Sequence, residues 1–226
     1  MPKPLVFPQA SPQPVVLHVS GLCFAHGQVP LLHDVAAAIP AGVSLLTGDE
    51  GRGKTTLLRL LARDLVPQAG SCVLVPERAS ADGGALDATR DPDAWRAAVF
   101  YADAREPKWD EWDVDAVLGH LRARHGATWN ATLLQDLIEA FALTEHRAKR
   151  LFMLSTGSRR KVMLAAAFAS GAALTLLDDP WAALDGPSRA LLTELLAEAA
   201  EHPTRAWLVS GYDAPPGVPL ATRWTL

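Results

Sequence analysis

The chain has 226 residues, of which 49% are hydrophobic and 20% are charged, a composition typical of a globular protein with a sizeable core. Its net charge is −4 at pH 7, which argues against a protein that binds nucleic acid through a broad basic surface. This length fits one compact domain, or one domain that carries a large insertion.

The first fourteen residues contain five prolines, so we expect residues 1–14 to form a flexible, extended lead. The prolines also exclude the apolar helix of a signal peptide. The most apolar long window, residues 162–177, is too short for a membrane span and contains Ser170 and Gly171. It predicts a buried helix followed by a buried strand.

Strands dominate the prediction for the first part of the chain. Residues 15–26 predict one or two strands, whereas residues 31–39 fit a strand or a helix equally well. The other elements expected here are a strand at 43–47, a helix at 54–65, a strand at 71–75 and a polar loop at 76–94. Cys23 and Cys72 fall in strand-like apolar runs and are expected as buried, inert thiols in a reducing compartment.

Helices are predicted to dominate from about residue 95 to 165, and after that strands and helices are expected to alternate. The elements expected in order are a strand at 97–102, helices at 114–124, 132–142 and 158–169, a strand at 174–179, a helix at 187–200, and strands at 206–210 and 223–226. Strands separated by helices predict the α/β class, with a parallel sheet covered by helices on both faces.

Residues 43–56 read VSLLTGDEGRGKTT and match the phosphate-binding pattern G-x-x-x-x-G-K-[ST] between an expected strand and an expected helix. Glycines allow successive backbone N–H groups to face one anion, which the positive end of the following helix also favours. The alternative is a glycine-rich turn with a chance Lys-Thr. The expected nucleotide-binding residues are Gly48, Asp49, Glu50, Gly51, Arg52, Gly53, Lys54, Thr55 and Thr56.

Two other segments carry candidate chemistry. The apolar run 174–180 ends in a carboxylate, and Asp178 is expected to hold Mg²⁺ opposite Thr55. Residues 154–161 read LSTGSRRK and open a helix, with Ser155 or Thr156 as its N-cap. This second segment is either a plain helix start or a second anion site.

The order of these motifs resembles the ATP-binding cassette ATPases, the nucleotide-binding subunits of ABC transporters, over residues 15–213. The resemblance implies a P-loop NTPase core with a parallel sheet, an N-terminal antiparallel β edge and an inserted helical subdomain. It implies a single domain at 15–226, with its core at 15–94 and 166–226 and its insertion at about 95–165. The implied cofactors are ATP and Mg²⁺.

The resemblance also implies roles for the motifs. Residues 48–56 would be the Walker A loop, 176–179 the Walker B strand, 154–158 the signature and 183–185 the D-loop with Asp185. In this family two cassettes dimerise head to tail, so Ser155, Thr156 and Gly157 would serve the nucleotide of a second cassette.

The implied partners are that second cassette, in a homodimer or heterodimer, and a separate membrane-spanning subunit. That subunit would hold the chain at the cytoplasmic face of the cell membrane. A nucleic-acid partner is not expected.

The sequence departs from the family at positions that serve catalysis. Asp179 stands where the family has the Glu that polarises water, and its carboxylate is one methylene shorter. No Gln lies between Gln68 and Gln135, so Asp103 or a neighbour replaces the family's Gln, and Gly211 falls where the switch His is usual. We therefore expect Mg-ATP binding with slow hydrolysis, and Asp179 as the candidate base. The alternative is a regulatory or partner subunit without useful turnover.

Some side chains keep two interpretations. His26, or Phe24 in another register, is either the ring that stacks on adenine or an ordinary packed residue. Trp109 and Trp112 belong either to the surface for the membrane subunit or to the core of the insertion. Arg52 points outward or adds charge near the phosphates, and the basic run 159–161 is a solvated helix face or steers ATP.

Overall fold

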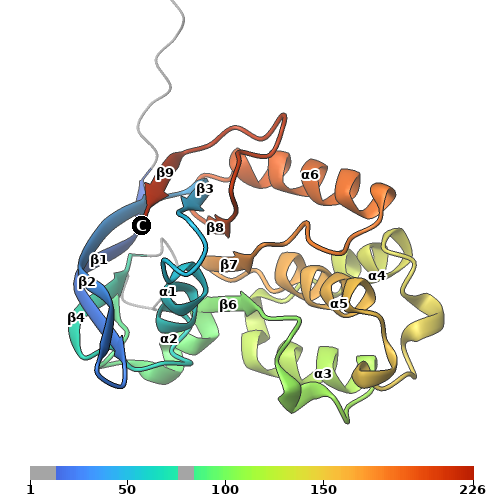
Figure 1. The fold of residues 1–226 in the computed structure, drawn as a ribbon. Coiled ribbons are helices and arrows are strands. Elements are labelled where there is room, and N and C mark those ends of the chain that lie inside the picture. Colours follow the sequence, from blue (N-terminus) through green and yellow to red (C-terminus); the bar gives the residue numbers. More distant parts are fainter. Residues whose placement is uncertain (1–13, 76–83) are drawn as a thin grey trace, which may run out of the picture.

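Two sheets organise the computed structural model, which describes residues 14–75 and 84–226 (Figure 1). A four-stranded sheet has the order β2-β1-β4-β5, and a five-stranded sheet has the order β6-β7-β8-β3-β9. The lead expected at 1–14 lies outside the described residues, apart from Pro14. Within the two described ranges, no helix combines the length and the apolar character needed to cross a membrane.

The strands confirm most of the expected positions and settle residues 31–39 as a strand. The strands are β1 (Val15–His26), β2 (Val29–Pro40), β3 (Gly42–Thr47), β4 (Ala69–Leu74), β5 (Leu86–Asp87), β6 (Val99–Ala102), β7 (Leu174–Asp178), β8 (Ala206–Ser210) and β9 (Thr222–Thr225).

Six α-helices and four short 3₁₀ turns connect these strands in the described ranges. The helices are α1 (Lys54–Leu61), α2 (Pro92–Ala98), α3 (Val114–His125), α4 (Ala131–Ala140), α5 (Thr156–Ala169) and α6 (Gly186–Ala200). The 3₁₀ turns are η1 (Pro107–Trp109), η2 (Gly126–Thr128), η3 (Thr144–His146) and η4 (Leu151–Met153).

The five-stranded sheet is parallel throughout, and its central strands are buried on both faces. All six residues of β3 and all five of β8 are buried, as expected for a parallel sheet covered by helices. In the register of the neighbouring strands, Asp178 of β7 lies opposite Ser210 of β8. The carboxyl ends of β3, β6, β7 and β8 therefore meet at one edge of the sheet, where ligands bind in such folds.

Two boundaries differ from the sequence prediction for local reasons. The helix expected at 54–65 ends at Leu61, since Arg63 takes a left-handed conformation with φ 64°. Part of the loop expected at 76–94 and the start of the strand expected at 97–102 are in fact helix α2. Pro92 at the first turn and Asp91 at the N-cap position begin this helix, and the strand starts at Val99.

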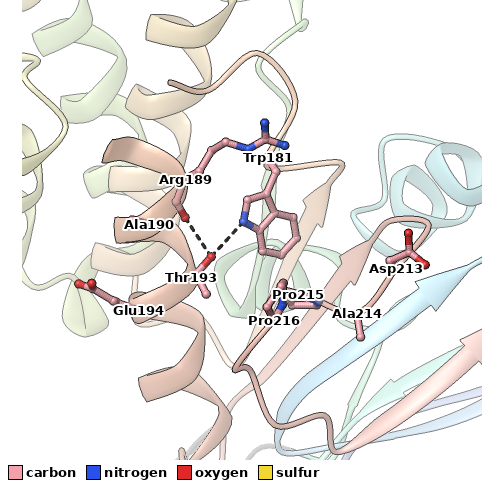
Figure 2. A pocket seen from close by; sticks show the side chains of 9 residues that line it. All are labelled: Trp181, Arg189, Ala190, Thr193, Glu194, Asp213, Ala214, Pro215 and Pro216. Atoms are coloured by element: carbon pink, nitrogen blue, oxygen red, sulfur yellow. Dashed lines mark hydrogen bonds between the residues drawn. The ribbon is translucent and has the colours of Figure 1, made fainter. Parts of the chain in front are cut away.

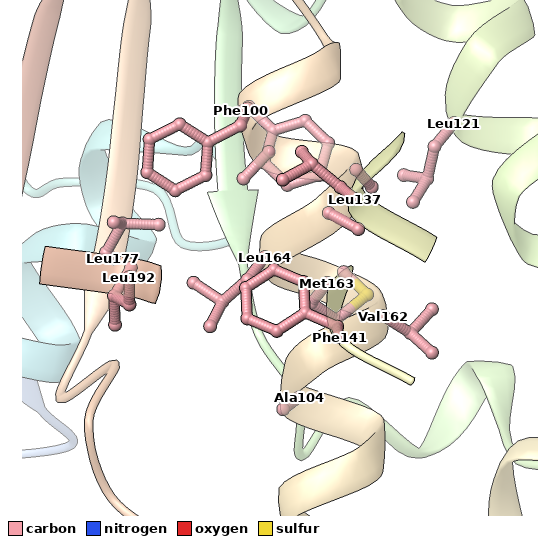
Figure 3. Packing of buried hydrophobic residues seen from close by; sticks show 14 of the residues in the cluster. Phe100, Ala104, Leu121, Leu137, Phe141, Val162, Met163, Leu164, Leu177 and Leu192 are labelled. Atoms are coloured by element: carbon pink, nitrogen blue, oxygen red, sulfur yellow. The ribbon is translucent and has the colours of Figure 1, made fainter. Parts of the chain in front are cut away.

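The helices between β6 and β7 pack on the sheet through a continuous apolar core. Figure 3 shows Phe141 from the end of α4 beside Met163 and Leu164 of α5, with Phe100 of β6 close to them. The same cluster includes Leu177 of β7. This continuity fixes α5, and with it the segment at its N-terminus, relative to the strand that carries Asp178.

One tryptophan of the pair Trp109 and Trp112 is buried and the other is exposed, and the two cysteines also differ in burial. Trp109 is buried in the cluster that includes α3 and α5, whereas Trp112 is 40% exposed and meets Trp109 edge-on. Cys72 is buried, and burial raises the pKa of its thiol to about 11, which fits an inert role. Cys23 is half-buried, so the expectation of burial is wrong for this thiol, and its Sγ accepts a hydrogen bond from the Asp34 N–H.

The fully buried Trp95 joins α2 to the end of α1. Its Nε1 donates to the Leu61 carbonyl at 2.8 Å, one of the helix-terminal carbonyls that lack a partner inside α1. We expect Trp95→Phe to lower the free energy of unfolding by about 1–3 kcal/mol, because this carbonyl loses its donor.

The control for this prediction is Trp112→Phe, an equivalent change at an exposed indole. Equilibrium urea unfolding followed by circular dichroism should show a change within about 0.5 kcal/mol for this control. Equal losses in the two variants would contradict the importance of the Trp95 hydrogen bond.

Candidate functional site

The loop between β3 and α1 turns sharply at its glycines. Gly51 and Gly53 have φ of 78° and 94°, which L side chains rarely adopt. A Cβ at Gly53 would also approach the Leu31 and Leu32 side chains to 3.1 and 3.2 Å. The positive φ of Gly53 and the lack of room for a Cβ together explain why glycine precedes α1.

The N-terminus of α1 follows this loop directly and has the features that could hold an anion. The first four N–H groups of a helix have no partner within it, and the helix dipole makes this end positive. Lys54, Thr55 and Thr56 fill the first turn, so no acidic side chain competes with an anion there. Asp49, Glu50 and Arg52 are exposed, which places Arg52 on the outer side of the loop.

The Lys54 ammonium lies inside the loop. Its Nζ donates to the Gly48 carbonyl at 2.6 Å and to the Asp49 carbonyl at 3.0 Å. It also lies 5.1 Å from the centroid of the Tyr212 ring, within the range of a cation–π contact. Lys54 is therefore held beside the helix N-terminus by weak partners that a phosphate can replace.

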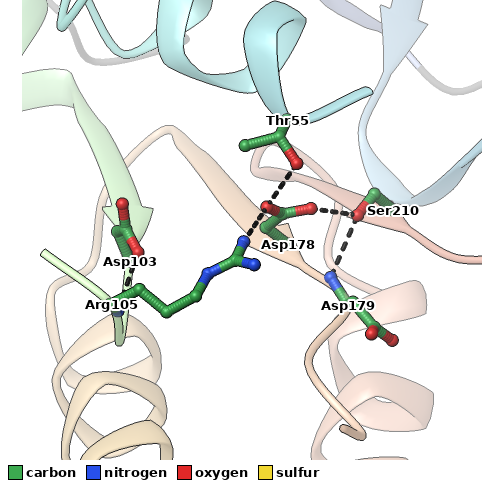
Figure 4. Close-up of polar contacts among 6 residues, drawn as sticks. All are labelled: Thr55, Asp103, Arg105, Asp178, Asp179 and Ser210. Atoms are coloured by element: carbon green, nitrogen blue, oxygen red, sulfur yellow. Dashed lines mark hydrogen bonds and ion pairs between the residues drawn. The ribbon is translucent and has the colours of Figure 1, made fainter. Parts of the chain in front are cut away.

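The structure brings Thr55 and Asp178 together, as the two motifs predicted. The Thr55 Oγ1 donates to Asp178 Oδ2 at 2.8 Å (Figure 4). The side chain of Asp178 is only 7% exposed, so its carboxylate needs hydrogen-bond donors from the protein. The Ser210 Oγ donates to the other carboxylate oxygen, Oδ1, at 2.7 Å.

This donor set suits Mg²⁺ that is shared with phosphate. A hydroxyl and a carboxylate are hard oxygen ligands, and Mg²⁺ is commonly held by one or two such groups together with substrate phosphates. In residues 14–75 and 84–226, no group of three or more His, Cys, Asp or Glu side chains could enclose a metal without a phosphate.

Ser210 is a site residue that the sequence analysis missed. It is buried at the end of β8, and its Oγ also accepts a hydrogen bond from the Asp179 N–H at 2.9 Å. The available signal was a polar residue at the end of the apolar run 206–210. This serine can be assigned to the site only when β7 and β8 are known to be neighbours, with Asp178 opposite Ser210.

Asp179 has an unusual backbone and an exposed side chain. Its φ is 44°, in the left-handed region that Asp tolerates better than most residues. In Figure 4 its carboxylate points away from Thr55 and from Arg105. As placed, Asp179 is adjacent to the candidate metal ligands but is not directed at them.

The segment after β6 contributes a cation that the sequence analysis also missed. Asp103 follows the strand, and its Oδ1 accepts a hydrogen bond from the Arg105 N–H at 2.9 Å. The Arg105 Nη2 donates to Asp178 Oδ2 at 2.9 Å. Burial raises the pKa of the nearby Tyr101 phenol, which keeps it neutral beside Asp178.

Two other predicted positions lie at the margins of the site. The Gly211 N–H donates to the Leu46 carbonyl at 3.1 Å, so this residue continues from β8 along β3. His26 is exposed at the end of β1 and meets Phe24 edge-on at 5.0 Å between ring centroids. Its stacking on adenine stays a prediction.

The signature segment begins α5 as expected. Ser155 is the N-cap, and its Oγ accepts a hydrogen bond from the Ser158 N–H at 3.1 Å, which confirms one of the two expected caps. Thr156 is exposed. Gly157 is buried against the Ala183 carbonyl, and a Cβ there would collide with this carbonyl. Gly157 is thus needed for close packing within its own chain, apart from any role toward a second cassette.

Of the two interpretations of residues 159–161, the solvated helix face is wrong, since each of the three side chains has a partner within the chain. Arg159 pairs with Asp110 at 2.6 Å, and the buried Arg160 donates to the Ala182 carbonyl. Lys161 pairs with Asp185 Oδ2 at 2.5 Å.

Asp185 caps α6 in addition to its ion pair with Lys161. Its Oδ1 accepts a hydrogen bond from the Ser188 N–H at 2.9 Å. The hydrogen bond from Lys161, together with those from Ser188, holds the pKa of this carboxyl well below its usual range. Asp185 therefore remains charged at neutral pH and fixes the start of α6.

An open groove of about 570 Å³ lies beside α6 (Figure 2). Trp181 forms part of its wall, and its Nε1 donates to the Thr193 Oγ1 at 3.4 Å. The residues after β8, Asp213–Pro216, form the opposite side. The groove contains none of the residues expected to bind nucleotide, so it is a separate feature.

Comparison with known proteins agrees with this geometry. The family model described as ABC transporter matches residues 32–182. A taurine import ATP-binding protein, TauB, from Pseudomonas savastanoi pv. phaseolicola is 29% identical over 203 residues, which cover 89% of this chain and 74% of that protein. An Fe(3+) ions import ATP-binding protein, FbpC 2, from Rhodococcus jostii is 30% identical over 209 residues. Those residues cover 92% of this chain and 58% of that longer protein.

Solved structures show the same fold. The structure of an ATP binding subunit of an ABC transporter superposes with a TM-score of 0.73 at 20% identity, over 87% of this chain and 79% of that chain. A nucleotide-free ATP-binding cassette from an ABC transporter superposes with a TM-score of 0.63 at 15% identity, over 88% of this chain and 81% of that chain.

The pair Asp178–Ser210 generates a stability prediction. Ser210→Ala removes a donor from a mostly buried carboxylate and an acceptor from the Asp179 N–H, so we expect a loss of about 1–3 kcal/mol in the free energy of unfolding. Equilibrium urea denaturation measures the change.

The matched control is Ser44→Ala, which changes another buried serine of the parallel sheet. The Ser44 hydroxyl has no hydrogen-bond partner within the described part of the chain. Its removal should therefore be neutral or slightly stabilising. Similar losses in Ser210→Ala and Ser44→Ala would show that the hydrogen bonds of Ser210 do not stabilise the site.

Proposed function

The chain belongs to the ABC transporter family of ATP-binding proteins, and from this premise we propose that it is the Mg-ATP-binding subunit of an ABC transporter with weakened ATPase activity. Members of this family bind ATP. The observation that carries the proposal is the hydrogen bond between Thr55 and Asp178, which joins the phosphate loop to the tip of β7. Two motifs far apart in the sequence thereby form one oxygen-rich site.

Binding of the triphosphate is proposed to use the phosphate loop and the first turn of α1. The backbone N–H groups of residues 51–56 surround the phosphates, favoured by the helix dipole. The Lys54 ammonium exchanges the Gly48 and Asp49 carbonyls for phosphate oxygens, which are stronger partners because they are charged. Asp49, Glu50 and Arg52 lie on the exposed side of this loop.

Thr55 and Asp178 are the proposed ligands of Mg²⁺. These two residues would hold the ion beside the phosphates, and its positive charge would offset the negative charge that develops during phosphoryl transfer. Ser210 positions Asp178, since its hydroxyl donates to the carboxylate oxygen that Thr55 does not contact.

Hydrolysis is proposed to depend on Asp179 as the base for water. A general base contributes about 10²–10⁴-fold when it is well positioned, and a displacement near 1 Å can cost about 10²-fold. The short side chain of Asp179 is exposed and directed away from Thr55. Gly211 adds no side chain at the position where the family has its switch His. Both features favour slow turnover.

The proposed partners are a second cassette and a membrane-spanning subunit at the cytoplasmic face of the cell membrane. Ser155, Thr156 and Gly157 would face the nucleotide of the second cassette, with the D-loop residue Asp185 next to them. Trp112, Phe152 and Met153 are exposed, and backbone hydrogen bonds link their segments, which suits contact with the membrane subunit. The names of the two curated relatives favour import.

A second candidate is a regulatory or partner subunit that binds nucleotide without useful turnover. The orientation of the Asp179 carboxylate and the glycine at position 211 favour it. The two candidates share the nucleotide site and differ in catalysis alone, so measurements of binding and of turnover separate them.

Lys54→Ala should weaken ATP binding at least about 30-fold, since the half-buried ammonium and its contact with phosphate are lost. Titration calorimetry of the full chain with Mg-ATP measures this change. Lys149→Ala is the control, because Lys149 contacts His146 in the helical part of the chain. Unchanged binding in Lys54→Ala would contradict the site assignment.

Asp179→Glu should raise kcat for ATP about tenfold or more, because the longer side chain has the reach to turn back toward the phosphates, from which the Asp179 carboxylate is directed away. Asp179→Asn, which removes the base and keeps the size, should reduce the residual turnover to the level of Lys54→Ala. Phosphate release at saturating Mg-ATP measures both variants. If the wild type and both variants bind ATP but none turns it over, the subunit without turnover is the correct candidate.

A further inference from the structure

We propose that Arg105 is a further residue of the nucleotide site, and that its guanidinium sets the metal dependence of ATP binding by competing with Mg²⁺ for Asp178. The inference rests on the proposed function and deepens it. Arg105 belongs neither to the phosphate loop nor to the apolar run that ends in Asp178, so neither sequence motif identifies it.

The guanidinium lies on the same oxygen that the metal would use. The Asp178 Oδ2 accepts hydrogen bonds from Thr55 Oγ1 at 2.8 Å and from Arg105 Nη2 at 2.9 Å, as Figure 4 shows. Thr55 and Asp178 are the proposed metal ligands. A cation that both of them bind must therefore share or replace the contact that Arg105 makes.

The backbone around Arg105 is fixed, whereas its side chain is free to move. The Asp103 carboxylate accepts the Arg105 N–H, and the neighbouring Ala104 carbonyl accepts a hydrogen bond from Arg159 Nε at 3.0 Å. The Arg105 side chain is 63% exposed, against 7% for Asp178. The guanidinium can thus leave the carboxylate without disturbing the core.

Charge balance explains why a cation is present at this point. The Asp178 carboxylate is mostly buried, and a buried charge without a counter-charge is costly. Arg105 supplies this counter-charge through its 2.9 Å contact with Asp178 Oδ2. When Mg²⁺ arrives with the nucleotide, the same carboxylate interacts with a doubly charged ion, and the guanidinium becomes redundant.

Two consequences act in the same direction. Arg105 opposes Mg²⁺ binding because both cations need Asp178, and it favours metal-free ATP because it offsets the repulsion between the phosphates and Asp178. Arg105 therefore reduces the factor by which Mg²⁺ tightens ATP binding. We define this metal factor as the Kd for ATP in EDTA divided by the Kd for ATP in Mg²⁺.

The test is titration calorimetry of the full chain with ATP, in Mg²⁺ and in EDTA. Arg105→Gln should raise the metal factor about tenfold, the effect expected from one charge-assisted hydrogen bond to a mostly buried carboxylate. Arg105→Lys, which keeps the charge, should remain near the wild type. Arg96→Gln is the matched control, since Arg96 makes a similar 3.0 Å ion pair with Asp93 on α2.

The outcomes separate this inference from the proposed function. If ATP binds but the metal factor is the same in the wild type and Arg105→Gln, the competition is refuted and the proposed function remains. An equal rise in Arg105→Gln and Arg105→Lys, or in Arg96→Gln, also refutes it. If the wild type binds no ATP in either buffer, the proposed function fails, and this inference fails with it.

Discussion

The hydrogen bonds of one mostly buried carboxylate, Asp178, join four parts of the chain at the carboxyl edge of the parallel sheet. Donors reach it from α1 through Thr55, from β8 through Ser210 and from the segment after β6 through Arg105. Burial makes each donor valuable, because a desolvated carboxylate left without partners is costly. The hydrogen bond from Thr55 therefore fixes the start of α1 relative to β7.

The sequence was sufficient to predict the local parts of this arrangement. A loop pattern followed by Lys54 and Thr55, and an apolar run that ends in Asp178, are each contained within a few residues. Ser210 and Arg105 lie 32 and 73 residues from Asp178. Their contacts depend on the strand order β6-β7-β8 and on register, which hydrophobic periodicity does not determine. Helix α2 was missed because its seven residues are too short for a periodic signal to outweigh the surrounding polar residues.

Binding and turnover depend on different kinds of structure in this protein. The proposed phosphate binding relies on backbone N–H groups and one helix N-terminus, so glycines and a single lysine largely specify it. Turnover requires a side chain placed to within about 1 Å, and Asp179 sits at a left-handed backbone position just past the end of β7. The Asp179 N–H donates a hydrogen bond to Ser210 Oγ, which fixes the backbone at this position, whereas the Asp179 side chain is exposed. Selection for binding alone would tolerate this arrangement.

The segment that follows Asp178 links the site to the signature helix within one chain. Arg160 of α5 donates to the Ala182 carbonyl, Lys161 pairs with Asp185, and Gly157 packs on the Ala183 carbonyl. Arg160 is buried, and this burial lowers the pKa of its guanidinium, so the side chain depends on the Ala182 carbonyl as a partner. The segment between Asp178 and Asp185 is therefore tied to the first turns of α5 at three points, which fixes the start of α5 relative to Asp178.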